Sequence, residues 1–286
     1  MKIGFEAGSF ATAGYKFGQY VQIGADLGFE FVELWIDRNN LWPLTVTKDE
    51  KRKATETLSE KNLKVVSTCP VPFKSEAWEQ FYYEFNLAHY NEGERKKAVK
   101  WATASMDLTR ELGADLMLVV PGKIEQPSFM ESKVSYRQYF ASVVKSLREC
   151  AKHARDIGLT LGVENAVVGN FGDRPDELYR IVREVNSESV KVYLDVANAN
   201  IFFPPVEYIR LLRGLLAPCL HITDNDGTHA DHHPIGMGTM NFKEILKELK
   251  AAGWDGILIP EIFYAKDPVG GLKRSKEKLA KLVQEL

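Results

Sequence analysis

The sequence predicts an α/β protein in which eight strand–helix units close into a (β/α)8 TIM barrel, a single domain that covers residues 1–286. Short apolar runs alternate with longer segments of helical periodicity along the whole chain, and eight of these runs have the length of a strand. The runs do not alternate apolar with polar residues, which indicates parallel strands buried on both faces. The chain length also suits this fold, since about 250 residues commonly form one such barrel.

The predicted strands follow one another along the chain with helical segments between them. They cover residues 2–5, 29–35, 63–67, 116–120, 159–163, 190–194, 217–222 and 256–259. Helical spacing at i, i+3, i+4 and i+7 is clearest over residues 178–185, 242–249 and 279–286. Thr47 with Glu50, and Asn241 with Glu244, are typical of helix N-termini, and Pro175 suits a first helical turn. Glycines that precede strands are expected to end four helices: Gly28, Gly113, Gly158 and Gly253.

An open, doubly wound sheet is the alternative arrangement of the same units. It is disfavoured because no Gly-x-Gly-x-x-Gly motif follows the first strand and because eight units close naturally. The long connections cover residues 36–46, 69–91, 121–134 and 165–172, and all of them follow strands. Long loops after strands are typical of a barrel whose functional site lies at the C-terminal ends of its strands.

Composition excludes several classes of partner. The formal net charge of −2 provides no positive field for nucleic acid or for an anionic membrane. No stretch approaches the roughly 18 apolar residues of a membrane span, and Met1 leads directly into a strand rather than into a signal peptide. The three cysteines are odd in number and far apart, which argues against a disulfide framework. We therefore expect a cytoplasmic protein that acts on a small molecule.

Polar side chains follow four successive strands of the predicted barrel. Glu164, Asp195, His221 and Glu261 each come directly after an apolar run, about one strand–helix unit apart. Residues at these positions point toward the mouth of a barrel. Three carboxylates and an imidazole at one point would carry close to three negative charges, which requires a cation. Three oxygens and one nitrogen without a thiolate suit one divalent metal ion, with Mn²⁺ expected first and Mg²⁺, Co²⁺ or Zn²⁺ as alternatives.

The motifs around these residues resemble those of the xylose isomerase-like TIM barrel superfamily, in particular the sugar phosphate isomerase/epimerase group with the ketose 3-epimerases. The motifs are Gly-Val-Glu-Asn at Glu164, Leu-Asp-Val-Ala-Asn at Asp195, Leu-His-Ile-Thr-Asp-Asn-Asp-Gly at His221, Gly236-Met237-Gly238 and Pro260-Glu261. The resemblance implies that the four residues bind one divalent metal ion. It also implies that Glu164 and Glu261 are catalytic and exchange a substrate proton through a cis-enediolate.

Several positions depart from these relatives. Asn198 stands where the family often has histidine, and Ala230 stands where endonuclease IV, a member of the superfamily with a third zinc, has an aspartate before the histidine that aligns with His232. A trinuclear phosphodiesterase is therefore not expected. Asp224 and Gly227 occupy the positions of the glutamate and arginine with which ketose 3-epimerases hold substrate hydroxyls.

The sequence therefore predicts a metal-dependent isomerase or epimerase that removes a proton next to the carbonyl of a small polyhydroxylated substrate. Alternatives are a dehydratase or other lyase of the same superfamily, of the inosose or 3-dehydroshikimate type, and a sugar-binding barrel subunit without catalysis. The resemblance is compatible with assembly of the chain into a homo-oligomer. Residues expected to contact substrate are Trp35, Lys123, Asn198, Asp224, Asp226 and His232.

Three further features of the early strands bear on the site. Glu6 ends the first strand, and Glu33 lies inside the second, where it can point into the barrel toward Trp35 or Lys123. The loop over residues 69–91 is rich in aromatic residues, among them Trp78, Phe81 and Tyr82. We expect this loop to form a lid, joined by Trp35 and Trp42, because sugars stack on aromatic faces and enediolates must be kept from water.

Overall fold

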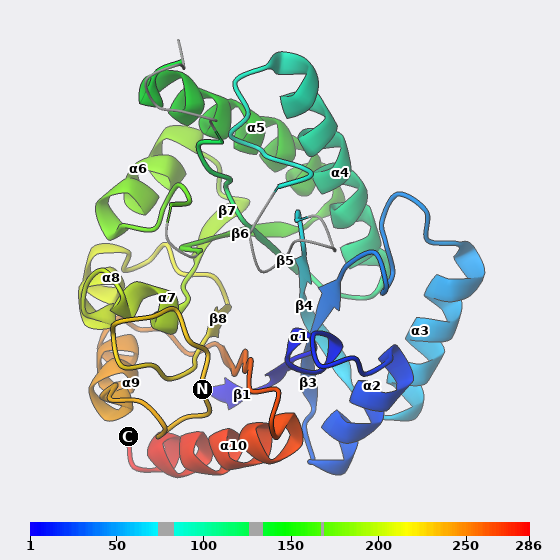
Figure 1. Ribbon diagram of the computed structural model, residues 1–286, viewed down its shortest axis with the longest axis vertical. Coiled ribbons are helices and arrows are strands. Elements are labelled where there is room, and N and C mark those ends of the chain that lie inside the picture. Colours follow the sequence, from blue (N-terminus) through cyan, green and yellow to red (C-terminus); the bar gives the residue numbers. More distant parts are fainter. Residues whose placement is uncertain (74–82, 126–133, 167–168) are drawn as a thin grey trace.

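The strands close into a barrel surrounded by helices, as predicted (Figure 1). The computed structural model describes residues 1–73, 83–125, 134–166 and 169–286. The strands are β1 (Lys2–Ile3), β2 (Phe5–Glu6), β3 (Phe31–Ile36), β4 (Lys64–Pro70), β5 (Leu116–Val119), β6 (Thr160–Glu164), β7 (Val190–Tyr193), β8 (Cys219–His221) and β9 (Ile257–Ile259). The helices are α1 (Gly8–Ala11), α2 (Phe17–Asp26), α3 (Lys48–Glu60), α4 (Glu92–Glu111), α5 (Tyr136–Ile157), α6 (Pro175–Val185), α7 (Val196–Asn200), α8 (Pro205–Leu211), α9 (Phe242–Ala251) and α10 (Pro268–Gln284).

Hydrogen bonds between two parallel sheets complete the barrel. One sheet has the order β2-β3-β4-β5-β6-β7 and the other the order β1-β9-β8. Between β7 and β8, the backbone N–H of His221 donates to the carbonyl oxygen of Leu194 at 3.0 Å. At the other seam, the N–H of Glu6 in β2 donates to the carbonyl oxygen of Pro260, just beyond β9, at 3.3 Å. This closure excludes the open, doubly wound sheet.

The first predicted strand is divided at Gly4. Its first part, β1, pairs with β9, and its second part, β2, pairs with β3. The chain passes so close to its neighbours there that a Cβ atom on Gly4 would lie 2.8 Å from Ile259 Cδ1 and 3.0 Å from the carbonyl oxygen of Phe31. Only glycine fits this position without displacing a strand.

Helix ends agree with the signals in the sequence. The Thr47 side chain accepts a hydrogen bond from the backbone of Glu50, whose carboxylate accepts one from the backbone of Thr47 in return. Gly158 ends α5 with a φ of 70°, a left-handed conformation that favours glycine. The short helices α7 and α8 were not predicted, since α7 has five residues and α8 seven, too few for a clear helical period.

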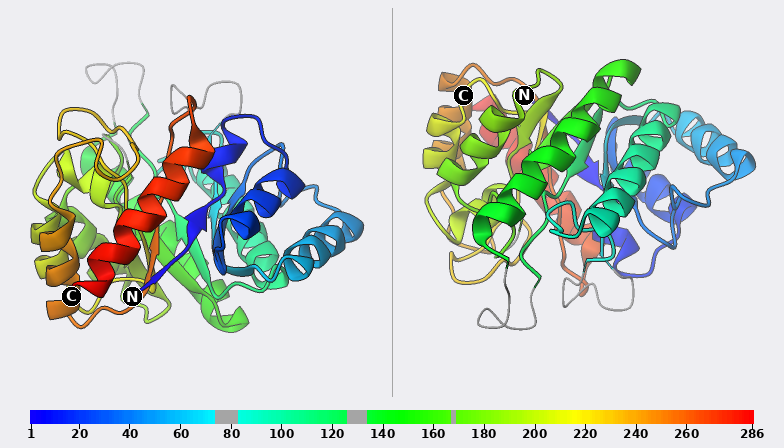
Figure 2. Two further views of the ribbon diagram at one scale, coloured as in Figure 1. Left: turned by 90° about the horizontal axis from the view of Figure 1, so that it is seen from below. Right: turned by 90° about the horizontal axis from the view of Figure 1, so that it is seen from above.

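The two termini lie near each other at one end of the barrel (Figure 2). Apolar side chains of the strands and of the inward helix faces form the core, and most of the fully buried large side chains are aromatic or aliphatic. Arg95 on α4 is an exception, because its guanidinium is buried and pairs with Glu92 and with Glu149 on α5. No helix in the part of the chain that the structure describes is long and apolar enough to cross a membrane.

Candidate active site

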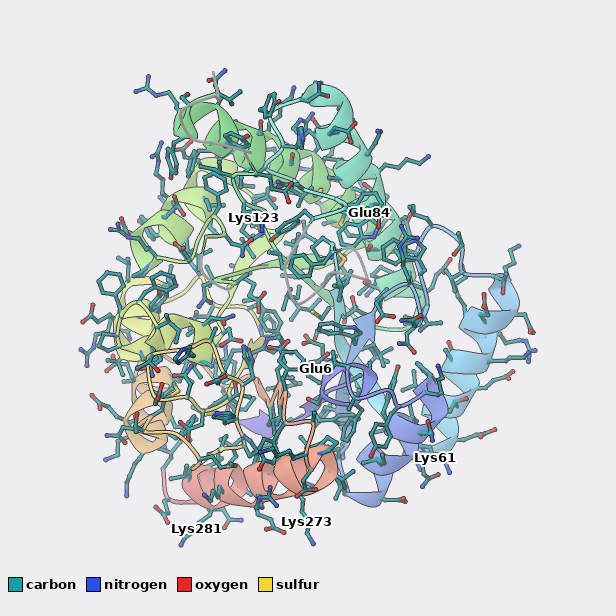
Figure 3. All side chains as sticks on the ribbon, in the orientation of Figure 1. Glu6, Lys61, Glu84, Lys123, Lys273 and Lys281 are labelled. Atoms are coloured by element: carbon teal, nitrogen blue, oxygen red, sulfur yellow. The ribbon has the colours of Figure 1, made fainter. Side chains whose placement is uncertain are left out.

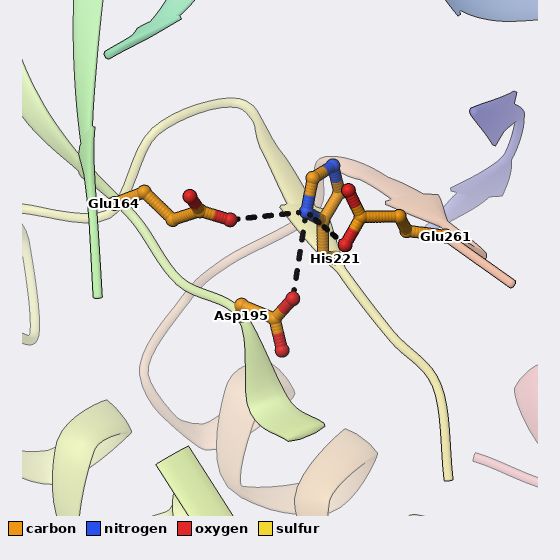
Figure 4. Close-up of side chains that lie close together, drawn as sticks. All are labelled: Glu164, Asp195, His221 and Glu261. Carbon is orange, nitrogen blue, oxygen red and sulfur yellow. Dashed lines mark ion pairs between the residues drawn. The ribbon is translucent and has the colours of Figure 1, made fainter. Parts of the chain in front are cut away.

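Four predicted side chains meet at one end of the barrel. Glu164 is the last residue of β6, Asp195 follows β7, His221 is the last residue of β8 and Glu261 lies just beyond β9. All four are buried, and one potential ligand atom of each lies within 4.8 Å of the others. Figure 4 shows Glu164 and Glu261 approaching His221 from opposite sides, with Asp195 between them. We call these residues the metal quartet.

His221 Nδ1 is at the centre of the metal quartet. It lies 3.3 Å from Glu164 Oε1, 3.3 Å from Glu261 Oε2 and 3.5 Å from Asp195 Oδ2. A single imidazole nitrogen cannot satisfy three carboxylates at once. The close approach of these oxygens therefore leaves their negative charge largely uncompensated.

Two buried atoms of the quartet have no hydrogen-bond partner among the described residues. They are His221 Nδ1 and Asp195 Oδ2. The other oxygen, Asp195 Oδ1, accepts a hydrogen bond of 2.8 Å from the backbone N–H of Asn198 at the start of α7, which orients the carboxylate. Buried polar atoms without partners are rare and costly. Three oxygens and one nitrogen converge here, and two of these atoms lack a hydrogen-bond partner among the described residues. This set of atoms is suited to binding a divalent cation.

Burial and mutual contact shift the pKa values of the quartet in the metal-free protein. Burial raises the pKa of Glu164 to about 7, although the contact with His221 acts in the opposite direction. For Asp195, burial would raise the pKa, but His232 and His221 together lower it below its usual value. Burial alone would lower the pKa of His221, yet the carboxylates of Glu261 and Glu33 raise it well above its usual value. His221 and the neighbouring His232 thus favour the charged forms of the carboxylates, whereas burial opposes them.

A cavity of about 250 Å³ opens beside the metal quartet. Both Glu164 and Glu261 line it, and the further polar side chains on its wall are Asn198, Asp231 and His232. The remainder of the wall, so far as the structure describes it, is Trp35, Cys69, Pro70, Val71, Pro72, Phe73, Val120, Ala166, Ala230 and Phe263. No lysine or arginine is among these described wall residues.

Three of the residues expected to contact substrate reach this cavity: Trp35, Asn198 and His232. His232 is buried, and its Nδ1 lies 3.0 Å from Glu261 Oε2 and 3.1 Å from the carbonyl oxygen of Glu261. Burial alone would lower the pKa of His232, but Asp195 and Glu261 raise it to about 9. In the metal-free protein these carboxylates therefore favour a protonated imidazole at the edge of the cavity.

The other three expected contacts lie elsewhere. The Asp224 carboxylate accepts hydrogen bonds from the backbone N–H groups of Gly236, at 2.7 Å, and Met240, at 3.2 Å, so it holds the loop after β8 together. Asp226 is exposed and accepts from Thr228. Lys123 is visible toward the upper part of the barrel in Figure 3, with its Nζ 5.7 Å from the centre of the Tyr83 ring. None of the three is among the described residues that line the cavity.

Some wall residues were missed or given another role by sequence reasoning. Cys69 was not among the residues expected to contact substrate, yet it lines the cavity, and burial raises the pKa of its thiol well above the usual value. Phe263 carried no motif, although its position two residues after Glu261 places it on the same side of the chain as that carboxylate. Glu33 does point into the barrel, where it contacts His221 rather than Trp35 or Lys123.

The predicted aromatic lid is described only in part. Trp78, Phe81 and Tyr82 lie outside the described residues. Phe85 stacks on Trp101 of α4 with ring centres 5.3 Å apart, and Trp42 lies 6.2 Å from Trp101, so both belong to the packed core. Two tryptophans were expected to join the lid. Trp35 is on the described cavity wall, and Trp42 is not.

Comparison with known proteins identifies the family. Residues 21–282 match the family model described as xylose isomerase-like TIM barrel, and the chain belongs to that family. Among its relatives, the uncharacterized protein MJ1311 of Methanocaldococcus jannaschii is 30% identical over 69% of this chain and 68% of its own. Fructoselysine 3-epimerase of Escherichia coli O157:H7 is 21% identical over 91% of each chain.

Solved structures show the same fold at lower identity. A D-tagatose 3-epimerase-like protein aligns with a TM-score of 0.82 at 23% identity and covers 100% of this chain and 99% of its own. The IOLI protein, solved with a bound zinc atom, has a TM-score of 0.78 at 18% identity and covers 100% and 99% of the two chains. AsbF of Bacillus anthracis, described as a probable 3-DHS dehydratase, has a TM-score of 0.72 at 16% identity over 98% and 99%.

Proposed function

We propose that this protein is a divalent-metal-dependent isomerase or epimerase of small, uncharged, polyhydroxylated carbonyl compounds. The observation that carries the proposal is the position of Glu164 and Glu261. Both carboxylates face one cavity, and each has an oxygen 3.3 Å from His221 Nδ1. Proton transfer on two faces of one carbon needs two such groups. The relatives that are named as 3-epimerases support the same reaction class.

The chemistry follows from this arrangement. One glutamate removes the proton from a carbon that carries a hydroxyl group next to the carbonyl, and the electrons of the broken C–H bond pass to the carbonyl to give an enediolate. The other glutamate returns a proton to the opposite face of that carbon, which epimerises it. If the proton returned to the neighbouring carbon instead, the carbonyl and hydroxyl groups would change places, and the reaction would be an isomerisation. A divalent ion held by the metal quartet would polarise the carbonyl and hydroxyl oxygens and so lower the barrier to proton removal.

The residues of the chain prepare these steps. In the metal-free protein burial raises the pKa of Glu164 to about 7, so its environment makes the carboxylate a stronger base than a solvent-exposed glutamate. His232 contacts Glu261 and limits the orientations of its carboxylate. The apolar side chains of Trp35, Val71 and Phe263 can exclude water from the reacting carbon. Asn198 lies on the cavity wall, which supports its proposed role as a contact for a substrate hydroxyl.

The charge of the cavity supports an uncharged substrate. Its described wall contains acidic side chains but no lysine or arginine. A phosphate group bound there would have no lysine or arginine to pair with on that described wall, and the His232 imidazole already contacts Glu261. The phosphate would also face Asp231 and the carboxylates of the quartet. We therefore propose free sugars or cyclic polyols rather than sugar phosphates as substrates.

A dehydratase is the second candidate, favoured by one observation. His232 lines the cavity with a pKa raised to about 9, the net result of burial, which lowers it, and of Asp195 and Glu261, which raise it. A protonated imidazole there can donate a proton to a departing hydroxyl group. Elimination would begin with the same proton abstraction and end with loss of water. His232→Asn would then abolish product formation but leave isotope exchange into the substrate.

Isotope exchange tests the proposal directly. Chelator-treated protein reloaded with Mn²⁺, Mg²⁺, Co²⁺ or Zn²⁺ is incubated in D₂O with free ketoses, inososes, keto acids and their phosphorylated counterparts, and the quenched mixtures are examined by NMR. We expect deuterium at one carbon next to the carbonyl of an uncharged compound, with an epimer or isomer as product. Full activity without metal would contradict the metal dependence, and preference for a phosphorylated compound would contradict the substrate class.

A further inference from the structure

A fourth carboxylate side chain lies beneath the three carboxylates and the imidazole of the metal quartet. Glu33 of β3 is completely buried, and its Oε1 lies 2.5 Å from Nε2 of His221, the imidazole nitrogen that faces away from the quartet. Glu33 is neither a member of the quartet nor a residue that lines the cavity. We therefore do not expect Glu33 to contact substrate. Any effect of Glu33 on the site must act through His221.

Two hydroxyl groups hold Glu33 in place. Tyr193 of β7 donates a hydrogen bond of 2.6 Å to Glu33 Oε2, and Ser67 of β4 donates to the same oxygen. All four residues of this network are fully buried. Because β3 and β8 are not neighbours in the barrel, the Glu33 side chain reaches His221 across the interior. The Tyr193 ring also packs edge-on against the imidazole, with ring centres 4.8 Å apart.

These contacts determine which nitrogen of His221 can bind a metal ion. Oε2 is occupied by two hydroxyl donors, so Oε1 is left to accept from Nε2. A hydrogen on Nε2 leaves the lone pair of Nδ1 free and directed at the three carboxylates. We infer that Glu33 is the positioning residue that presents His221 Nδ1 as a metal ligand and increases its basicity, with Tyr193 and Ser67 fixing Glu33 in turn. This inference rests on the metal site of the proposed function.

A plain buried ion pair is the competing explanation for the same contact. A carboxylate that only neutralised a buried imidazolium would stabilise the protonated, metal-free state, so its removal would not weaken metal binding. The positions of the two hydroxyl donors favour the positioning role, because they restrict Glu33 to one orientation beyond what charge neutralisation requires. Metal affinity and the protonation site of the imidazole distinguish the two roles.

Glu6 provides a matched control. Like Glu33 it is a fully buried glutamate near the same end of the barrel. Its carboxylate accepts hydrogen bonds from the backbone N–H groups of Gly8, at 2.7 Å, and Ser9, at 3.0 Å, and no hydrogen bond or ion pair joins it to His221 within the described ranges. A Glu6→Gln substitution therefore makes the same chemical change at the same depth without removing a hydrogen bond of the network. Its electrostatic interaction with Glu261, Glu33 and His221 makes it a control for the loss of a nearby buried carboxylate as such.

The experiment measures Mn²⁺ and Zn²⁺ affinity by calorimetry on chelator-treated wild type, Glu33→Gln, Tyr193→Phe and Glu6→Gln. We expect Glu33→Gln to weaken binding by about 10- to 100-fold, the usual effect of removing a group that orients a metal-bound histidine. Tyr193→Phe should weaken binding by a smaller factor, and Glu6→Gln, which removes a nearby carboxylate without a hydrogen bond to His221, should change it much less than Glu33→Gln does. An unchanged affinity in folded Glu33→Gln would overturn the inference.

A second measurement does not depend on any substitution. ¹⁵N NMR of histidine-labelled wild type loaded with diamagnetic Zn²⁺ should show His221 bound through Nδ1 and protonated at Nε2. Binding through Nε2 would overturn the inference even if Glu33→Gln failed to fold. Both measurements are independent of turnover. A wild type that binds metal in this way but exchanges no substrate proton would contradict the proposed function and leave the role of Glu33 intact.

Discussion

Asp195 Oδ2 and His221 Nδ1 lie 3.5 Å apart in the barrel interior, and neither atom has a hydrogen-bond partner in the ranges that the structure describes. The two residues also belong to neighbouring strand ends that are held in register, because the backbone of His221 hydrogen-bonds to Leu194. Their separation is therefore set by the barrel and not by their own attraction. A preformed gap between a carboxylate and an imidazole is what a metal site requires.

Metal removal should therefore lower thermal stability. A divalent ion that binds the folded but not the unfolded chain adds about 2.7 kcal/mol at 100 times its dissociation constant. For a chain of this size, we expect the melting temperature to rise by roughly 5 °C or more when Mn²⁺ is added to chelator-treated protein. Differential scanning fluorimetry checks this. Asp195→Ala should abolish the shift, and a melting temperature that no divalent ion changes would contradict the site.

Replacement of either glutamate should stop turnover without unfolding the protein. Glu164→Gln and Glu261→Gln keep the shape of the side chain but remove a proton acceptor, and a positioned acid or base typically contributes about 10²- to 10⁴-fold. We expect kcat to fall by at least about 100-fold in each variant. If the two carboxylates serve opposite faces of one carbon, each variant should lose deuterium exchange more strongly from one epimer than from the other.

Glu60→Gln, on the exposed side of α3, is the matched control for these two variants. Its kcat should equal that of wild type, and circular dichroism should show the same fold in all three. Turnover close to wild type in both Glu164→Gln and Glu261→Gln would mean that the cavity binds a ligand without transforming it.

The barrel and the metal quartet were predictable from the sequence for one physical reason. Parallel strands buried on both faces appear as apolar runs, and their C-terminal ends meet at one edge whatever the loops do. The strand itself therefore brings a polar residue that follows such a run to this edge of the barrel. Glu164 and His221 are the last residues of their strands, and Asp195 lies two residues beyond the end of β7.

Residues in the loops could not be placed in the same way. Asp224 lies three residues after His221, but the turn at Gly236 brings backbone N–H groups to its carboxylate and withdraws it from the cavity. That turn depends on contacts between distant parts of the loop. The contact of Glu33 with His221 spans 188 residues of sequence and crosses the barrel, so no local pattern could reveal it.

Acid should weaken the contact between α4 and α5. Hydrogen bonds from Arg95, which contributes most, and from Lys145 lower the pKa of Glu92 from its usual 4.5 to about 2. A carboxyl with a lowered pKa in the folded state stabilises the fold above pH 4.5, and this contribution is lost as the pH falls through 2. We therefore expect Glu92→Gln to melt below wild type at pH 7, with the difference shrinking between pH 4.5 and pH 2.

Thermal melts of wild type and Glu92→Gln at pH 7, 5, 4 and 3 follow this difference. Glu60→Gln again serves as the control, because its carboxylate has no ion pair within the described ranges and its curve should parallel that of wild type. A difference between Glu92→Gln and wild type that stayed constant across the series would show that Glu92 acts through something other than its charge.

Two glycines of α2 should respond in opposite ways to the same substitution. A Cβ atom on Gly24 would lie 2.3 Å from the Phe5 ring, which is fully buried, so Gly24→Ala must displace β2 or the helix. Overpacking of this kind costs about 1–3 kcal/mol. Gly18 is exposed, and a Cβ atom there would meet nothing within 4 Å. Gly18→Ala should therefore stabilise the protein by about 0.5 kcal/mol through the unfolded chain. Urea unfolding of both variants measures the difference in their free energies of unfolding. Equal stability would contradict the close packing of Gly24 in α2 against Phe5 in β2.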